Sequence, residues 1–219
     1  KPFVQLETTR GCFNTCAFCV SGGEKPVRTL SMEAIRQRLE IIHQHGIKNV
    51  RVLDRTFNFN PRRAKELLQL FQEFHPHIRF HLEIHPALLS EDLKTELQQL
   101  PEGLLHLEAG IQSLREPVLE KCKRLGKLND ALEGLQFLCS LDNMETHADL
   151  IAGLPLYRLN EIFEDIRILA EFQAGEIQLE SLKLLPGTDM RRRANELGIQ
   201  YSPMPPYEVL RTEDITPEE

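Results

Sequence analysis

Three cysteines near the N-terminus carry the strongest chemical signal in this sequence. Cys12, Cys16 and Cys19 fall within eight residues, in the spacing CxxxCxxC. Each thiolate can bind one iron of a cubane iron–sulfur cluster, for which the usual ferredoxin arrangement needs four cysteines. Only three are close together here, so one iron would lack a protein thiolate. An open coordination position of this kind distinguishes catalytic metal centres from closed structural ones.

A zinc site is the competing interpretation of these cysteines. Structural zinc typically uses two CxxC-type pairs. The remaining cysteines, Cys122 and Cys139, lie far along the chain within helical patterns and supply no such second pair. They are typical of small buried apolar residues. The spacing and the missing pair favour an iron–sulfur cluster, and an odd total of cysteines fits a reducing cytoplasm better than a disulfide framework.

The cysteines directly follow a predicted strand, in a chain where strands and helices alternate. We expect strands over 3–7, 49–53, 79–85, 104–111, 145–151 and 176–184. We expect helices over 31–45, 61–74, 90–100, 116–141 (broken near Gly126), 160–173 and 189–197. The predicted N-caps are Ser31, Asn60, Ser90, Asn160 and either Thr188 or Asp189, and the predicted helix stops are Gly46, Gly103, Gly175 and Gly198. This alternation predicts an α/β fold built from right-handed βαβ units around a parallel sheet.

One face of the later strands is repeatedly polar. The polar positions are His81, Glu83 and His85, then His106, Glu108 and Gln112, then Glu145, His147 and Asp149, and finally Gln178 and Glu180. A sheet covered on both sides would bury these groups only at high cost. A curved sheet can instead turn them towards a wet concave cleft while helices cover its convex side. The pattern therefore favours an open barrel with a lined lumen over a closed barrel packed with apolar layers.

Composition limits the partners of this chain. Its 219 residues include 26 Lys and Arg against 33 Asp and Glu, for a formal net charge of -7. This balance argues against a broad nucleic-acid footprint. No apolar stretch is long enough to span a bilayer, and no signal peptide opens the chain, so we expect a cytoplasmic protein. The chain begins without Met, almost directly in a strand, which suggests a piece of a longer protein. We expect a core domain over 1–200 and, over 201–219, the start of a linker or C-terminal extension.

The cysteine segment resembles the signature of the radical S-adenosylmethionine (SAM) superfamily, in which the residue before the third cysteine is aromatic, as Phe18 is. The resemblance extends over nearly the whole chain, through 107–113, 149–155 and 184–188. It implies a partial (β/α)6 TIM-like barrel of radical SAM type and a [4Fe-4S] cluster on the three cysteines, with SAM on the open iron. In the family, an electron from the cluster cleaves SAM to methionine and a 5′-deoxyadenosyl radical, which abstracts hydrogen from a substrate.

The resemblance also implies which residues contact SAM. Glu108 corresponds to a ligand of the ribose or the amino group, and Arg124 to a ligand of the carboxylate. Asp149, Gly153 and Leu185 fall in the turns that lie near the adenosine in the family.

Other polar residues keep two interpretations. Arg55 and Glu83 are either pocket residues or a structural ion pair inside the barrel. His81, His85, His106 and His147 either face substrate or are hydrogen-bonded parts of the structure. Many family members hold the SAM amino group with a Gly-Gly-Glu motif after the second strand. Here Gly22-Gly23-Glu24 comes directly behind the cysteines, so it is not assigned that role and the amino-group contact stays open.

The segments 54–58, 108–113, 149–155 and 205–210 most resemble the subgroup that has a cobalamin-binding domain before the barrel and an uncharacterised domain after it. The chain shows no cobalamin-ligand motif of its own, so cobalamin would be available only through a domain outside it. The resemblance predicts a radical SAM enzyme core, with either cobalamin-dependent methyl transfer or a dehydrogenation or rearrangement without cobalamin. The alternative is an iron–sulfur electron-transfer or scaffold module without SAM chemistry, although such a carrier has no need of a lined cavity. A small-molecule substrate is favoured over nucleic acid, with transfer RNA modification less favoured, and the expected reductant is a flavodoxin or ferredoxin.

Overall fold

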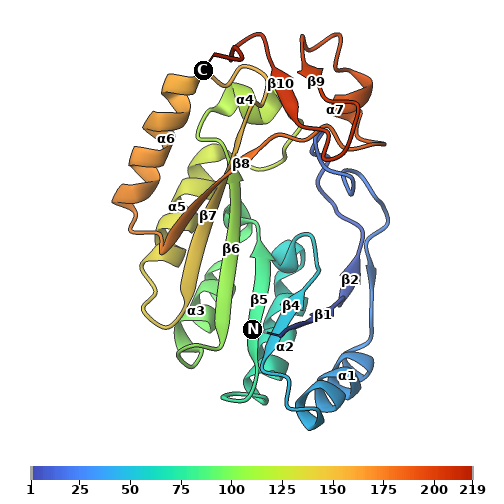
Figure 1. Ribbon diagram of the computed structural model, residues 1–219. Coiled ribbons are helices and arrows are strands. Elements are labelled where there is room, and N and C mark those ends of the chain that lie inside the picture. The colour runs from blue at the N-terminus through green and yellow to red at the C-terminus, as the bar shows by residue number, and fades with distance from the viewer. Residues whose placement is uncertain (1, 219) are drawn as a thin grey trace.

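A six-stranded parallel sheet forms the centre of the protein (Figure 1). The computed structural model describes residues 2–218. The strands lie in the order β1-β4-β5-β6-β7-β8, and every neighbouring pair is parallel. Their bounds are β1 Val4–Leu6, β4 Asn49–Val52, β5 Arg79–Ile84, β6 Leu105–Gln112, β7 Glu145–Ala152 and β8 Glu176–Ser181. The strands follow one another across the sheet in chain order, so the predicted α/β fold with a partial (β/α)6 barrel is confirmed.

Helices cover the convex side of this sheet and leave its concave side open (Figure 1). Their bounds are α1 Met32–Gln44, α2 Pro61–Gln72, α3 Glu91–Gln99, α5 Leu128–Cys139 and α6 Leu159–Glu171. Two shorter helices, α4 Glu116–Lys121 and α7 Asp189–Arg192, lie at one end of the sheet (Figure 1). The core lies between the two layers. There the ring of Phe71 on α2 stacks on that of Phe80 on β5, with centroids 4.0 Å apart. The apolar face of β5 and β6 is buried in this layer, so the polar face of both strands is turned to the concave side.

Most predicted helix starts are confirmed by their caps. The side chains of Ser31, Asn60, Ser90 and Thr188 each accept a backbone N–H from the first turn of their helix. The prediction for Asn160 is wrong, because α6 begins at Leu159 and has Arg158 as its N-cap. The Glu161 carboxylate in the first turn accepts the backbone N–H of Arg158 at 3.0 Å. The Glu161 carboxylate therefore caps α6 in place of the Asn160 side-chain amide.

The predicted stop at Gly175 is also wrong. Gln173, with φ of 58°, is the left-handed residue that follows α6. The expected break near Gly126 is confirmed, since α4 ends at Lys121 and α5 begins at Leu128. Gly126 has φ of 109°, and a Cβ there would lie 3.0 Å from Cε1 of His85. The break carries Arg124 out of both helices and towards the mouth of the barrel.

Short elements outside the main sheet were not predicted from the sequence. Two antiparallel pairs join β2 Thr9–Arg10 to β3 Arg28–Thr29 and β9 Gln200–Tyr201 to β10 Val209–Arg211. Two 3-10 turns, η1 Phe57–Phe59 and η2 Pro86–Leu88, follow β4 and β5. The final segment returns to the barrel, where the backbone N–H of Val209 donates to Leu182 at 3.0 Å. The domain boundary at residue 200 stays a prediction. Among residues 2–218, no helix is both long and apolar enough to cross a membrane.

Candidate active site

The cysteine segment is a closed loop between β2 and β3, at the end of the barrel where the sheet strands finish (Figure 1). Its two ends are joined by the pairing of Thr9 with Thr29. Inside the loop the N–H of Cys12 donates to Glu24 at 3.0 Å, and the N–H of Gly23 donates to Asn14 at 2.8 Å. A Cβ at Gly22 would collide with the carbonyl oxygen of Cys16. The Gly22-Gly23-Glu24 segment therefore shapes the loop that presents the cysteines.

A buried aspartate fixes the start of this loop to the sheet. Asp54, two residues after the end of β4, is 1% exposed. Its carboxylate accepts the backbone N–H groups of Thr8 and Thr9 at 2.8 and 2.9 Å and also the hydroxyl of Thr8. These bonds tie the end of β1 to the end of β4, and they set the direction in which the chain enters the cysteine loop.

The three thiols open into one cavity of about 290 Å³. Cys12 and Cys16 are buried, Cys19 is partly exposed, and none of them forms a disulfide. Burial raises the pKa of the Cys16 thiol, while the Arg124 guanidinium acts in the opposite direction. Of the described residues, no other cysteine lines this cavity. Three sulfur donors facing one space fit a [4Fe-4S] cluster with one iron left open to a further ligand.

The other two cysteines are unsuited to metal binding. Cys122 and Cys139 do not line the cavity, and burial raises the pKa of their thiols to about 12 and about 11. Both side chains are therefore protonated at neutral pH. They behave as the small apolar residues expected from the sequence.

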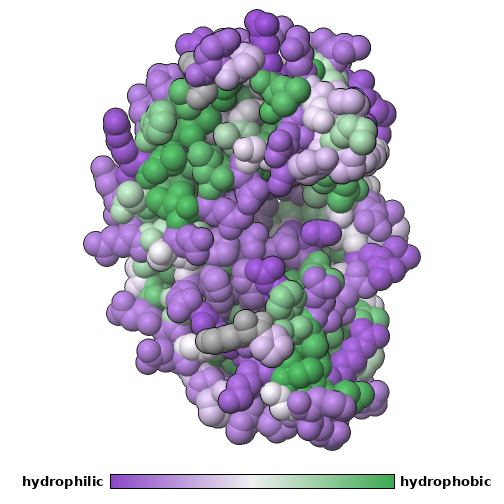
Figure 2. All heavy atoms as spheres, in the orientation of Figure 1, coloured by the Kyte–Doolittle hydropathy of each residue, from purple (hydrophilic) through white to green (hydrophobic). Residues whose placement is uncertain are grey.

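The wall of the cavity opposite the cysteines is polar, and Figure 2 shows a hollow on this face rimmed mainly by hydrophilic side chains. Six residues predicted from the sequence line the same cavity as the cysteines, namely Phe18, Arg55, Glu83, Glu108, Arg124 and Asp149. Two others do not line it. Gly153 belongs to a separate cavity of about 210 Å³ beside Val209, and Leu185 lines neither of the two. The roles of all these residues stay predictions.

Several lining residues were not among the predicted site residues. They are Asn14, Thr56, Gln112, Leu150, Ile151, Gln178 and Glu180. The alternating polar pattern gave a signal for Gln112, Gln178 and Glu180. Asn14 and Thr56 lie in loops, where no periodicity shows which way a side chain points.

Arg124 bridges the cysteine loop and the sheet. Its Nη1 lies 3.7 Å from Sγ of Cys16, and its Nη2 donates to the carbonyl of Gly110. The register between β6 and β7 shifts between Gly110 and Gln112, and Gln112 has φ of 73°. This irregularity ends the regular ladder beside the cavity, at the carbonyl that Arg124 binds. The guanidinium thus lies beside Cys16, and its hydrogen bond to the Gly110 carbonyl on β6 fixes its orientation.

Arg55 and Glu83 line the same cavity without a direct bond. Among the described residues, no ion pair joins them. Burial and the neighbouring Glu108 raise the pKa of the Glu83 carboxyl, whereas the positive charge of Arg55 lowers it. A structural ion pair is therefore not observed, and both groups remain open to a ligand.

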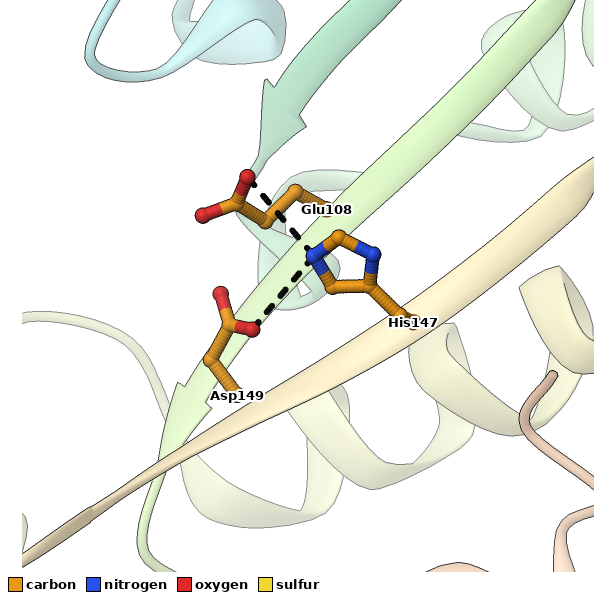
Figure 3. Close-up of side chains that lie close together, drawn as sticks. All are labelled: Glu108, His147 and Asp149. Carbon is orange, nitrogen blue, oxygen red and sulfur yellow. Dashed lines mark ion pairs between the residues drawn. The ribbon is translucent and has the colours of Figure 1, made fainter. Parts of the chain in front are cut away.

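The carboxylates of Glu108 and Asp149 form the floor of the cavity, and they contact histidines that do not line it. His81 and His106 line a separate cavity of about 210 Å³. The strand register pairs Glu83 with Glu108 and Glu108 with His147. His81 Nε2 lies 2.7 Å from Oε2 of Glu108, and His147 Nε2 lies 3.6 Å from the same oxygen and 3.5 Å from Oδ1 of Asp149 (Figure 3).

This floor perturbs the carboxyl groups in opposite directions. The imidazoles of His147 and His81 hold the pKa of Glu108 well below its usual range. Burial, followed by the charge of Glu108, raises the pKa of Asp149 to about 8. Divergent pKa values in one cleft are typical of functional sites.

The chain matches a family model and several known proteins. Residues 6–169 match the model of the radical SAM superfamily. The ribosomal protein uS12 methylthiotransferase RimO of Desulfitobacterium hafniense (strain Y51) is 24% identical over 195 residues, which cover 83% of this chain and 42% of RimO. The cobalamin-dependent radical SAM methyltransferase TokK of Streptomyces tokunonensis is 23% identical over 211 residues, covering 92% of this chain and 31% of TokK.

The solved structures extend the likeness in fold. The radical SAM methyltransferase TsrM from Kitasatospora setae, solved with cobalamin and a [4Fe-4S] cluster bound, superposes with a TM-score of 0.76 at 18% identity. The match covers 97% of this chain and 43% of TsrM. This chain therefore spans less than half the length of each of these three proteins.

Proposed function

This chain belongs to the radical SAM superfamily, and we propose that it reductively cleaves SAM at a [4Fe-4S] cluster bound by Cys12, Cys16 and Cys19. The observation that carries the proposal is the single cavity into which the three thiols, a guanidinium and several carboxylates open. When bound, the cluster supplies the electron that breaks a carbon–sulfur bond of SAM and releases methionine and a 5′-deoxyadenosyl radical. The remaining work is done by the residues of the chain.

Arg124 is the proposed ligand of the SAM carboxylate. Its guanidinium lies beside Cys16, and a guanidinium binds a carboxylate through two parallel hydrogen bonds. The carbonyl of Gly110 holds Arg124 before SAM arrives. The orientation of this group therefore costs little when SAM binds.

The polar wall provides contacts for the rest of SAM and for the substrate. Glu108 and Asp149 each turn one carboxylate oxygen to His147 and leave the other directed away from it (Figure 3). We assign the outward oxygen of Glu108 to the ribose or the amino group and that of Asp149 to the adenosine. Arg55 and Glu83 lie in the same cavity and are assigned to the substrate side.

Methyl transfer that uses cobalamin is the reaction class that we propose for the whole protein. The support is the likeness to TokK and TsrM, whose names describe such methyltransferases. Cobalamin would come from a domain outside this chain. We further propose a small-molecule substrate, because the formal net charge is -7, together with a flavodoxin or ferredoxin as reductant in the cytoplasm.

The proposal is tested by anaerobic reconstitution with iron and sulfide, followed by electron paramagnetic resonance of the reduced protein with and without SAM. We expect a cubane signal that SAM changes, together with release of methionine and 5′-deoxyadenosine. Cys16→Ala should lose the cluster, whereas Cys139→Ala, at a cysteine that does not line the cavity, should keep it. A cluster that ignores SAM, or a protein that takes up zinc in place of the cluster, contradicts the proposal and leaves an electron-transfer or scaffold module.

A further inference from the structure

Beneath the cysteine-lined cavity lies a group of metal-binding side chains that has no part in holding an iron–sulfur cluster. Glu108 comes from β6, and His147 and Asp149 come from β7 (Figure 3). One donor atom of each lies within 4.8 Å of the donor atoms of the other two. Both carboxylates point to the same nitrogen, Nε2 of His147 (Figure 3).

The central nitrogen makes ion-pair contacts with both carboxylates but no hydrogen bond. The His147 side chain is 7% exposed, and neither its Nε2 nor Oδ1 of Asp149 has a hydrogen-bond partner among the described residues. Buried polar atoms are nearly always paired, so two facing orphans in one cluster call for a further ligand. Burial of both without such a ligand would be costly.

The spacing of these atoms identifies the kind of ligand. Nε2 of His147 lies 3.6 Å from Oε2 of Glu108 and 3.5 Å from Oδ1 of Asp149. A hydrogen bond between such atoms would measure about 2.7–3.2 Å. Two ligands on one tetrahedral metal ion, each with a bond of about 2.0–2.2 Å, lie about 3.3–3.6 Å apart. The observed distances are too long for hydrogen bonds and match two ligands on one ion.

Neighbouring side chains fix the orientation that metal binding requires. Nδ1 of His147 lies 3.0 Å from Nε2 of His106. If Nδ1 donates its proton there, Nε2 keeps a free lone pair directed at the two carboxylates. His81 lies 2.7 Å from Oε2 of Glu108 and holds that carboxylate in place. Metal-binding histidines usually have such an orienting partner on their second nitrogen.

From these observations we infer that Glu108, His147 and Asp149 bind a divalent transition-metal ion at the floor of the cavity. Nitrogen and oxygen donors without sulfur suit Zn²⁺, Fe²⁺ or Mn²⁺. Glu108 and Asp149 also line the cavity that holds the cysteines, whereas His147 lies behind them. The open positions of the ion therefore face the cavity, where they would take an oxygen atom of a substrate. The outward oxygens of both carboxylates remain available to SAM, so the metal ion and SAM would share these two residues through different oxygen atoms.

The test uses Zn²⁺ as probe on the full chain after its cluster has been reconstituted, so that the cysteines are already occupied. Metal analysis after dialysis against Zn²⁺ should find one zinc per chain in addition to the iron. His147→Ala and the nearly isosteric Asp149→Asn should weaken zinc binding by about 100-fold or more, because loss of an orienting neighbour alone costs about 10–100-fold. Their iron content and circular dichroism should not change. His45→Ala, at an exposed histidine after α1, is the matched control and should keep the zinc.

X-ray absorption at the zinc edge identifies the ligands directly. Nitrogen and oxygen neighbours at about 2.0–2.1 Å support the inference, whereas sulfur neighbours at about 2.3 Å would place the zinc at the cysteines. The inference is overturned by a sulfur shell, by a reconstituted chain that takes up no zinc, or by a folded His147→Ala chain that still binds it. In each of these cases the three residues form a hydrogen-bonded or ionic group only. SAM cleavage is measured separately by release of 5′-deoxyadenosine, so the failure of either proposal is recognised without the other.

Discussion

His85 makes the stability of this chain depend on pH in a way that one substitution can isolate. The residue follows β5 and is 4% exposed. Its Nε2 lies 3.0 Å from the carbonyl of Leu125, and its Nδ1 is buried without a hydrogen-bond partner among the described residues. Burial, followed by the positive charge of Arg124, lowers the pKa of His85 from 6.5 to about 3. The imidazole is therefore neutral in the folded protein, and Nε2 donates to Leu125.

A lowered folded-state pKa means that the unfolded chain binds a proton more readily than the folded chain. The contribution of His85 to the free energy of unfolding is complete above a pH of 6.5, the unfolded value, and it is lost as the pH falls towards 3. With these two pKa values, His85 should remove about 1.4 kcal/mol of stability between about pH 7.5 and about pH 5.5.

His85→Gln removes the titration and keeps a side-chain N–H that can donate to Leu125. Urea unfolding of both chains at the two pH values gives four free energies of unfolding. We expect the loss on acidification to be about 1.4 kcal/mol smaller in His85→Gln than in the unchanged chain. Because His106, whose pKa is lowered to about 4, is present in both chains, its contribution cancels. Equal losses in the two chains would refute the reasoning, since they would show that His85 is already charged or solvated in the folded state.

Two further substitutions, each with a matched control, test the site and the fold in other ways. Arg124→Lys should raise the SAM concentration for half-maximal cleavage by about 10- to 100-fold, because a bidentate charge-assisted contact becomes a single hydrogen bond. Cleavage assays measure this concentration. The control Arg167→Lys, at an exposed position, should leave it unchanged. Asp165→Asn should lower the free energy of unfolding by about 3 kcal/mol, because the fully buried carboxylate pairs with Arg115 at 2.7 Å. In the same urea measurements, Glu164→Gln should lower it by less than about 1 kcal/mol, because Glu164 pairs with Arg115 from an exposed position. An unchanged SAM requirement in Arg124→Lys would contradict its assignment, and equal effects at Asp165 and Glu164 would contradict the burial argument.

Much of the barrel could be predicted because its signals are local. A strand turns successive side chains to opposite faces, so the alternation of Phe80, His81, Leu82 and Glu83 already separates the core face from the cavity face. The caps confirmed at α1, α2, α3 and α7 depend on bonds within one helical turn. The errors at Asn160 and Gly175 arose where a neighbouring side chain or residue took over the same local role.

The organisation of the site depends on residues far apart in the chain, and it could hardly be predicted from the sequence. Asp54 reads as one loop acid among many, yet it binds two backbone amides at the end of β1. Arg124 was assigned to SAM by resemblance. Its orientation comes from the carbonyl of Gly110, and this contact depends on how β6 packs against the loop between α4 and α5. Such contacts depend on register and loop paths, which no local pattern encodes.

The reactive groups of this protein could be identified from its sequence, namely three cysteines at cluster spacing and polar residues on alternate strand positions. Residue types and the two-residue alternation of a strand involve only residues that are close in the chain, so both can be recognised without a structure. The meeting of Glu108, His147 and Asp149 at distances suited to a metal ion is a property of the folded chain and has no signal in the sequence. The pairing of β6 with β7 sets those distances, and pairing depends on how the whole sheet packs against its helices.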